Sequence, residues 1–367
     1  MSAEPGGPRS SGVDWSLATA TALRLVPPGP ELSAREVAEV VAELRDCAQL
    51  AEDHVARATG LRSDQTGTRA PVLVVDRPGW IRANVDAFSS ILAPLTEQMA
   101  ERASSTPWLT GVGARASGIE VGVLLSYLAP KILGQFDPYA EPAGRLLLVA
   151  PNVAQIEREL RVPHRDFRLW VCLHEETHRV QFTAVPWLRD HLRSQIAEVV
   201  SSADLGVDAL GELIKAAVER INNRRDAPDG EELSLLELVQ TPQQRAVIDH
   251  ITAIMTLLEG HADYMMDQVG PDVIPTIVQI RAKFTQRRGG QGIDKIIRRL
   301  LGLDAKMRQY RDGAAFCGTV ITAVGLDGFN RVWTDPTTLP TRDEITDPQR
   351  WLDRVVPGHP AELDSAG

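Results

Sequence analysis

The sequence predicts a mainly α-helical protein with a small β-sheet in its N-terminal half. Apolar residues recur at helical spacing over most of the chain after Pro151, which is typical of packed helices. Only two short segments, 71–76 and 144–150, are rich in branched apolar residues and bounded by turn-forming residues, as strands are. No internal repeat is visible, so we expect neither a solenoid nor a propeller.

The first half of the chain combines these strands with helices. Residues 1–13 are rich in Gly, Pro and Ser, and we expect them to be disordered. Ser33 then begins an amphipathic helix that reaches about Thr59, and Glu36 stands at the capping-box position. Two more helices are predicted near 81–104 and 114–134, the second of them apolar almost all round and therefore buried.

The second half of the chain is predicted to be helical almost to its end. The expected helices cover 152–161, 166–184, 187–203, 206–223, 242–269, 272–288, 292–303, 305–325 and 347–355. Asp166 is the expected N-cap of the second of them, and an exposed loop is expected at 226–232. We expect a single domain over 14–355, with a possible N-terminal subdomain (14–140), a helical part (141–355) and a tail at 356–367.

Composition limits the classes of function. The 367 residues are 43% hydrophobic and 24% charged, as in globular proteins, and the formal net charge is -10. Such a charge disfavours binding to nucleic acids and anionic membranes. No run approaches about 20 apolar residues, and the start of the chain has no secretory pattern. These features predict a soluble, cytoplasmic protein, and three dispersed cysteines predict no disulfide framework.

One segment reverses the sign of the charge. Between Arg281 and Arg311, ten basic residues accompany only two acidic ones, Asp294 and Asp304. A solvated helical face explains this pattern. The alternative is a site for an anionic group of a substrate or for an acidic partner.

The strongest chemical signal is the sequence His174-Glu-Glu-Thr-His178 in the predicted helix 166–184. Residues four apart lie on the same face of a helix, so both imidazoles can reach one Zn²⁺ ion. Glu175 can contact a water on the same ion and act as its general base. The flanking residues are apolar, so two histidines here need polar partners, which a metal supplies. We therefore predict one zinc ion per chain.

A site of this type needs a third protein ligand, and Glu259 is the best candidate. It stands in the apolar helix 242–269, where an unpaired carboxylate is costly. Asp263, four residues later on the same face, can accept the free ring N–H of a ligating histidine. His250, His261 and Glu176 are the alternative third ligands.

Other polar residues near these motifs have weaker claims. His261, Tyr264 and Tyr310 are candidates for holding an oxyanion or polarising a carbonyl, although each can equally be a packed residue. His164 and His191 are interpreted as structural, and Cys172 as a core cysteine.

The pattern of His174, Glu175, His178, Glu259 and Asp263 resembles that of the gluzincin branch of the zincin metallopeptidases. The departure is the separation of roughly eighty residues between His178 and Glu259, which implies an inserted helical hairpin near 187–223 and a different substrate cleft. Longer stretches are also similar to an actinobacterial family of zincin-like hydrolases, namely VDRPGWIRANVDAF, GRLLLVAPN, LWVCLHEETHRVQF, VPWLRDHL, EGHADYMMD and GLDGFNRVW. Members of that family are labelled as zinc-dependent metalloproteases or as associated with coenzyme F-420 biosynthesis. The resemblance implies a zincin-like fold but no particular substrate.

Three functions follow from these features. The leading one is a metallopeptidase or related amide hydrolase acting on a peptide or small amide, with the 144–150 strand as the edge that receives an extended peptide. The second is a catalytically silent, zinc-stabilised binding or scaffold protein, which has little reason to keep Glu175. The third is a small-molecule amidohydrolase in coenzyme or envelope metabolism, whose anionic substrate meets the basic segment 281–311.

Overall fold

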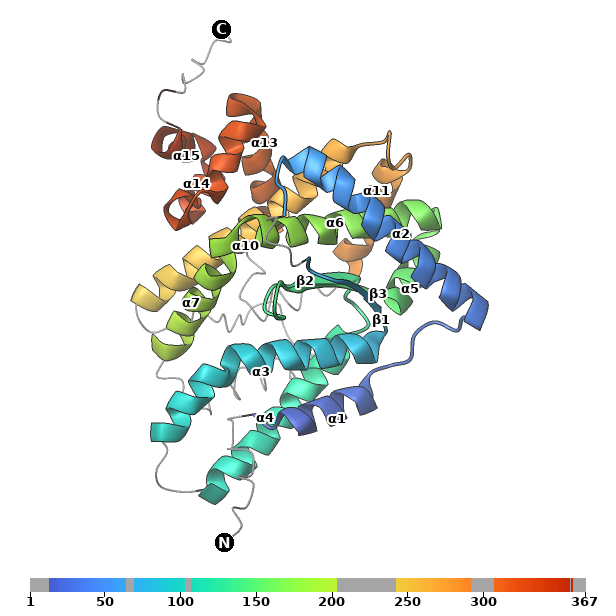
Figure 1. The fold of residues 1–367 in the computed structure, drawn as a ribbon, viewed down its shortest axis with the longest axis vertical. Coiled ribbons are helices and arrows are strands. Elements are labelled where there is room, and N and C mark those ends of the chain that lie inside the picture. The colour runs from blue at the N-terminus through green and yellow to red at the C-terminus, as the bar shows by residue number, and fades with distance from the viewer. Residues whose placement is uncertain are drawn as a thin grey trace. The chain divides into compact units, whose positions relative to one another are not determined.

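The computed structural model describes residues 13–63, 69–102, 107–202, 242–291, 307–356 and 358 (Figure 1). The chain divides into two compact units. Unit 1 comprises 1–31, 75–132 and 200–231, and unit 2 comprises 32–74, 133–199 and 232–367. Both units are built from separate stretches of the chain, and the long helix that follows Ser33 belongs to unit 2.

The described part of unit 1 is helical. Helix α1 (Trp15–Leu25) packs against α4 (Pro107–Leu128) and α3 (Arg77–Arg102). Asp14 caps α1 by accepting a hydrogen bond from the backbone N–H of Leu17. Glycine permits the close approach of α1 and α4, because a Cβ on Gly118 would lie 2.5 Å from the carbonyl oxygen of Asp14. Sequence analysis had not predicted α1.

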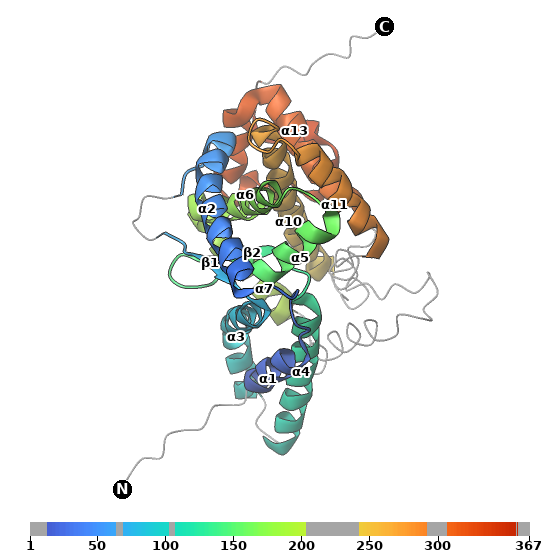
Figure 2. The same cartoon turned by 90° about the vertical axis from the view of Figure 1, so that its right-hand side faces the viewer.

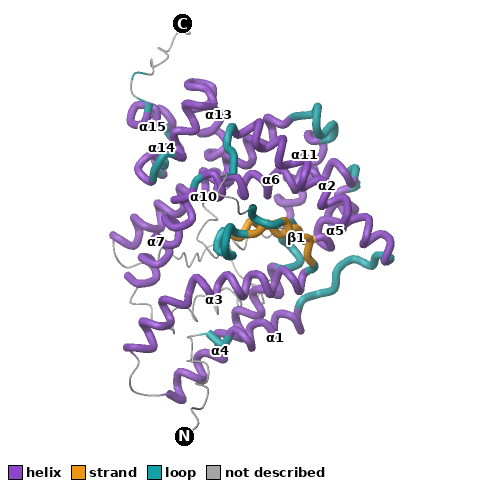
Figure 3. The backbone as a smooth tube through the Cα atoms, in the orientation of Figure 1, coloured by secondary structure: helices purple, strands orange, loops and turns teal. Residues whose placement is uncertain are grey.

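Unit 2 contains a three-stranded sheet of β1 (Val72–Val75), β2 (Gly134–Asp137) and β3 (Arg145–Val149). The strand order is β1-β3-β2, and β2 pairs antiparallel with β3 so that Gly134 lies opposite Leu148. The strands are drawn in orange among the helices in Figure 3. The prediction that 144–150 forms an edge strand is therefore wrong, because β3 is flanked on both sides. The two edge strands are β1 and β2, and the sequence pattern does not reveal β2.

The centre of unit 2 is helix α6 (His164–Ala184), which packs against α2 (Ala34–Thr59), α5 (Ala150–Leu160), α10 (Pro242–Val269) and the strands β2 and β3 (Figures 1 and 2). Two buried arginines of α6 tie it to α2. Arg168 pairs with Glu43 and with Glu157 of α5, and Arg179 pairs with Glu52 and with Glu176 of its own helix. These ion pairs connect α6 to α2 near both ends of α6.

The remaining elements of unit 2 surround α6 and α10. Helix α7 (Pro186–Ser202) follows α6 directly, and α11 (Ile277–Gln291) contacts α5 and α6. Helix α13 (Met307–Phe329) packs along α10 and is interrupted at Gly325, which has a φ of 73°. The 3₁₀ turns Asn330–Trp333 and Pro336–Thr338 and the helices α14 (Arg342–Thr346) and α15 (Pro348–Val355) complete a second apolar core with α7, α10 and α13.

The predicted mainly helical fold with a small sheet is confirmed. The capping box at Ser33 and Glu36 is present. Asp166 is not the N-cap of α6, since the helix begins at His164; its carboxylate instead accepts hydrogen bonds from the backbone N–H and hydroxyl of Thr276. The predicted helices 206–223 and 292–303, the loop 226–232 and most of both tails lie outside the described residues. Among the described residues, no helix has the length and apolar character needed to cross a membrane.

Candidate metal centre

Helix α6 presents both histidines of the His-Glu-Glu-Thr-His motif from a largely buried segment. The two histidines retain 23% and 14% side-chain exposure, whereas nearly all their neighbours from Phe167 to Gln181 are buried. The four-residue spacing places the rings side by side, nearly perpendicular to each other. Nε2 of His174 lies 3.2 Å from Nε2 of His178.

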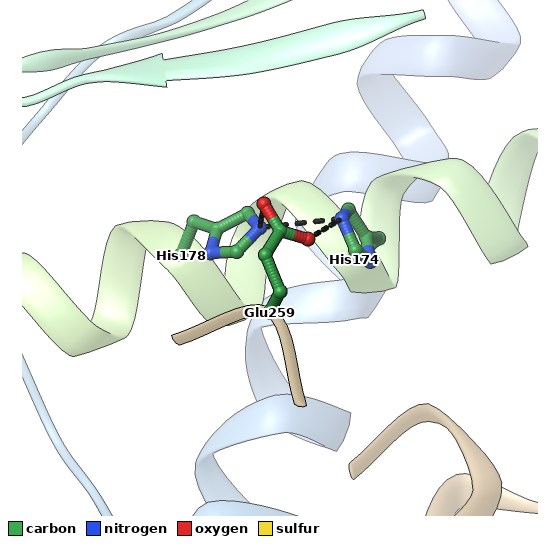
Figure 4. A group of neighbouring side chains, drawn as sticks. All are labelled: His174, His178 and Glu259. Carbon is green, nitrogen blue, oxygen red and sulfur yellow. Dashed lines mark hydrogen bonds and ion pairs between the residues drawn. The ribbon is translucent and has the colours of Figure 1, made fainter. Parts of the chain in front are cut away.

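Glu259 of α10 completes a group of three metal-ligating side chains (Figure 4). Its carboxylate oxygens lie 3.6 Å from Nε2 of His174 and 3.7 Å from Nε2 of His178. Ligand atoms about 2.0–2.1 Å from a tetrahedral zinc ion are separated by about 3.4 Å. The separations of 3.2, 3.6 and 3.7 Å are close to this value, the two carboxylate distances being to different oxygens of Glu259. Two imidazoles with one carboxylate are a donor set that zinc prefers.

Electrostatics at the site also favour a cation. Burial of His178 opposes its protonation, but the negative charges of Glu259, Glu175 and Asp263 outweigh burial and raise its pKa. Surroundings that stabilise an added positive charge on the ring also stabilise a divalent cation beside it.

The alternative third ligands have other partners. Glu176 is buried and accepts two hydrogen bonds from Arg179. His250 lies against His191 of α7, with their Nε2 atoms 3.0 Å apart. In the described part of the chain, the group of His174, His178 and Glu259 is the one that brings three such ligands together.

Glu175 is a buried carboxylate whose pKa is raised by its surroundings. Its side chain is 7% exposed, and burial raises the pKa of its carboxyl to about 7, with the nearby charge of Glu259 adding to the effect and that of His178 opposing it. A base with a pKa near the working pH combines a useful ionised fraction with a strong tendency to take up a proton.

The edge strand β2 reaches the metal centre through Gly134. A Cβ atom on Gly134 would lie 2.4 Å from Cγ of Glu175, so only glycine leaves room for that side chain in this position. Val149 donates its N–H to the carbonyl of Leu133, and antiparallel pairing then directs the backbone groups of Gly134 and Phe136 away from β3. These groups face the side of β2 with which no described strand pairs.

The hydrogen-bond partner of Nδ1 of His178 is Gln181. Nδ1 of His178 lies 2.9 Å from Oε1 of Gln181, one turn further along α6. Asp263 was expected to accept an N–H from a ligating histidine, but at His178 this place is taken by Gln181, and Asp263 acts on the ring as a nearby negative charge.

Three residues were candidates for contacting a substrate, and the structure describes the side chains of two of them, His261 and Tyr264. His261 is fully buried and stacks on Phe329, so it is not exposed to a substrate, and its expected oxyanion role is not supported. Tyr264 packs with the apolar residues of α10 and α13 beside Gly318. The side chain of Tyr310 lies outside the described residues.

The described part of the basic segment takes part in packing. Arg281 pairs with Asp267 and donates to the carbonyl of Asp263, and Lys283 donates to two carbonyl groups at the end of α5. Arg287 pairs with Glu159 of α5. These contacts favour the structural interpretation of residues 281–287; the side chains from 288 to 311 lie outside the described residues.

Comparison with known proteins agrees with the fold. The family model of the zincin-like metallopeptidases matches residues 13–352. The chain belongs to this family. It is also similar to a crystal structure from Chloroflexus aurantiacus, presented as a candidate hydrolase with a novel fold, at 31% identity and a TM-score of 0.68 over 94% of this chain and 99% of the other. No curated protein matches the chain.

Membership of the zincin-like metallopeptidases implies a zinc-dependent hydrolase, and the group of His174, His178 and Glu259 fits the metal. Sequence reasoning missed two residues of the site, Gly134 and Gln181. Gly134 contacts a residue distant in the chain, and Gln181 contacts Leu258 as well as His178. The position of the glutamine three residues after the second histidine was the one detectable signal.

Proposed function

We propose that the protein is a zinc metallopeptidase that hydrolyses an amide bond with Glu175 as its general base and acid. The observation that carries the proposal is the placement of a buried carboxylate, with a pKa near 7, beside a group of three converging metal ligands. When bound, zinc would polarise the substrate carbonyl and acidify a water molecule.

The residues of the chain bind the metal and transfer the proton. His174, His178 and Glu259 hold the metal. Glu175 takes a proton from the attacking water and returns it to the leaving amine, which requires a carboxyl that can exist in both protonation states near neutral pH. Burial of Glu175 excludes bulk water and strengthens its electrostatic coupling to the reacting atoms.

A peptide substrate is favoured by the edge strand. The backbone groups of Gly134 and Phe136 point away from β3, and Gly134 lies against Glu175. An extended peptide paired with β2 would therefore pass close to the general base. The receiving strand is β2, in place of the 144–150 strand expected from the sequence.

The experiment is digestion of a peptide library by the zinc-loaded protein, with cleavage sites read by mass spectrometry. The matched control is Glu175→Gln, which keeps the shape of the side chain but cannot accept the proton. We expect cleavage by the wild type and none by Glu175→Gln at equal zinc content. Equal cleavage by both would contradict the proposed mechanism, and no cleavage by the wild type would remove the peptide substrate class.

The alternative of a catalytically silent scaffold explains less of the structure. A scaffold would need the metal ligands but neither a buried glutamate with a raised pKa nor a glycine that leaves room for it. The small-molecule alternative relied on the basic segment, whose described residues are engaged in packing.

A further inference from the structure

We propose that Gln181 is the positioning residue of the metal centre. Its amide holds His178 in the ligating tautomer and clamps α6 to α10 beside Glu259, and His261 holds the amide in place. The inference rests on the proposed zinc site and assigns roles to two residues outside its ligand set.

The contacts of Gln181 fix the orientation of its amide. One end of the amide lies 2.9 Å from the carbonyl oxygen of Leu258, which can only accept a hydrogen bond. The atom facing Leu258 must therefore be the NH₂ group, and the opposite end, facing His178, must be the carbonyl oxygen Oε1. The side chain is fully buried, so water does not compete for these bonds.

This orientation determines the tautomer of His178. Because Oε1 of Gln181 can only accept, Nδ1 of His178 must carry the proton. Nε2, which faces His174 and Glu259, then carries the lone pair that a metal ion requires. Gln181 thus prepares His178 for ligation before a metal arrives.

His261 supports the amide from the other side. Nε2 of Gln181 lies 3.0 Å from Nδ1 of His261. Because the amide nitrogen donates, Nδ1 of His261 must accept, and the ring of His261 must be neutral. The ring stacks on Phe329 and meets Trp333 edge-on, which fixes its orientation.

The same amide links the two helices that supply the ligands. Leu258 immediately precedes Glu259, so the bond from Gln181 to the Leu258 carbonyl sets the distance between α6 and α10 at the third ligand. Gly260 follows Glu259 and lies against Gly313 of α13, because a Cβ there would lie 2.2 Å from the backbone of Gly313. Helix α10 therefore contacts both α6 and α13 next to the position of Glu259.

The experiment measures zinc affinity by competition with a chelator for the wild type, Gln181→Met, Gln181→Glu and His261→Phe. Methionine matches the length of glutamine but makes none of its three hydrogen bonds, and we expect it to weaken zinc binding about 10- to 100-fold. Glutamate keeps an acceptor for Nδ1 of His178 but loses the donor to Leu258 and His261, so it is expected to recover only part of the affinity. Gln349→Met, at an exposed glutamine of α15, is the matched control and is expected to bind zinc like the wild type.

His261 is tested by a double-mutant cycle. If His261 acts through Gln181, His261→Phe costs less affinity than Gln181→Met, and the double variant is no weaker than Gln181→Met alone. The visible spectrum of the cobalt-loaded protein reports ligand geometry, and we expect it to change in Gln181→Met and to return in Gln181→Glu. The melting temperature of each metal-free variant separates these effects from general loss of folding.

The possible failures are distinguishable. Absence of zinc binding by the wild type would overturn the proposed function itself. A zinc-binding wild type with an equally tight Gln181→Met would overturn the positioning role alone. Equal losses in Gln181→Met and Gln181→Glu would overturn the role of Gln181 in setting the tautomer of His178. Additive losses in the double variant would overturn the role of His261.

Discussion

Gly134 of β2 lies directly against Glu175 of α6, so closely that a methyl group on Gly134 would lie 2.4 Å from Cγ of the glutamate. The edge strand β2 therefore leaves room for the side chain of Glu175 only because residue 134 is a glycine. We predict that Gly134→Ala displaces Glu175 and lowers kcat/KM about 100-fold, the cost typical of a misplacement of about 1 Å. Zinc content should stay at the wild-type level, because the three atoms nearest to an added Cβ on Gly134 all belong to Glu175 and not to a ligand. Undiminished peptide cleavage by Gly134→Ala would show that Glu175 does not act from this position.

The raised pKa of Glu175 predicts that the metal-free protein loses stability as the pH rises. The folded state holds this proton more tightly than the unfolded state, so the contribution of Glu175 to stability is full below about pH 4.5 and is lost as pH rises through about 7. Glu175→Gln removes this loss. Its free energy of unfolding relative to the wild type should therefore increase by roughly 2–3 kcal/mol between pH 5 and 7.5, measured by urea denaturation with a chelator present. A difference that does not change with pH would contradict the raised pKa.

The pair of Arg179 and Glu176 should contribute strongly to stability, since both side chains are 1% exposed. We predict that Arg179→Met destabilises the protein by about 3–5 kcal/mol, because Glu176 is left buried without its cation. The control is Arg35→Met, which breaks an exposed pair with Glu39 and should leave the free energy of unfolding nearly unchanged. Similar losses in the two variants, measured by urea denaturation, would mean that Glu176 finds another partner.

Zinc should stabilise the folded protein because the ligand group exists only when α6 and α10 are packed together. At a free zinc concentration about 100 times the Kd, the stabilisation is about 2.7 kcal/mol, which corresponds to a rise of several degrees in the melting temperature of unit 2. Calorimetry with zinc and with a chelator measures the rise, and Glu259→Ala should show a smaller one. A melting temperature independent of zinc would contradict the coupling between metal binding and folding.

The sequence was informative where a function depends on local spacing. His174, Glu175 and His178 lie within five residues of one helix, and helical geometry alone predicts that they share a face. Glu259 could be singled out because a carboxylate in an apolar helix needs a partner. The capping box at Ser33 and most helices followed for the same reason, since they depend on residues only three or four apart.

The remaining features depend on contacts between distant segments. Strand β2 has four residues and one apolar side chain in its centre, so its sequence carries no alternating pattern, and its place at the edge depends on pairing with β3. The role of Gln181 depends on a carbonyl 77 residues away, and that of Gly134 on a side chain of α6. For His261, the type of residue suggested chemistry, whereas full burial between aromatic rings determines its role.

The central claim is that His174, His178 and Glu259 hold one zinc ion beside Glu175, and metal analysis of three purified proteins tests it most directly. We predict about one zinc per chain in the wild type and in Glu175→Gln, and much less in Glu259→Ala. Full zinc content in Glu259→Ala would remove Glu259 from the site, and absence of zinc from the wild type would contradict the account as a whole.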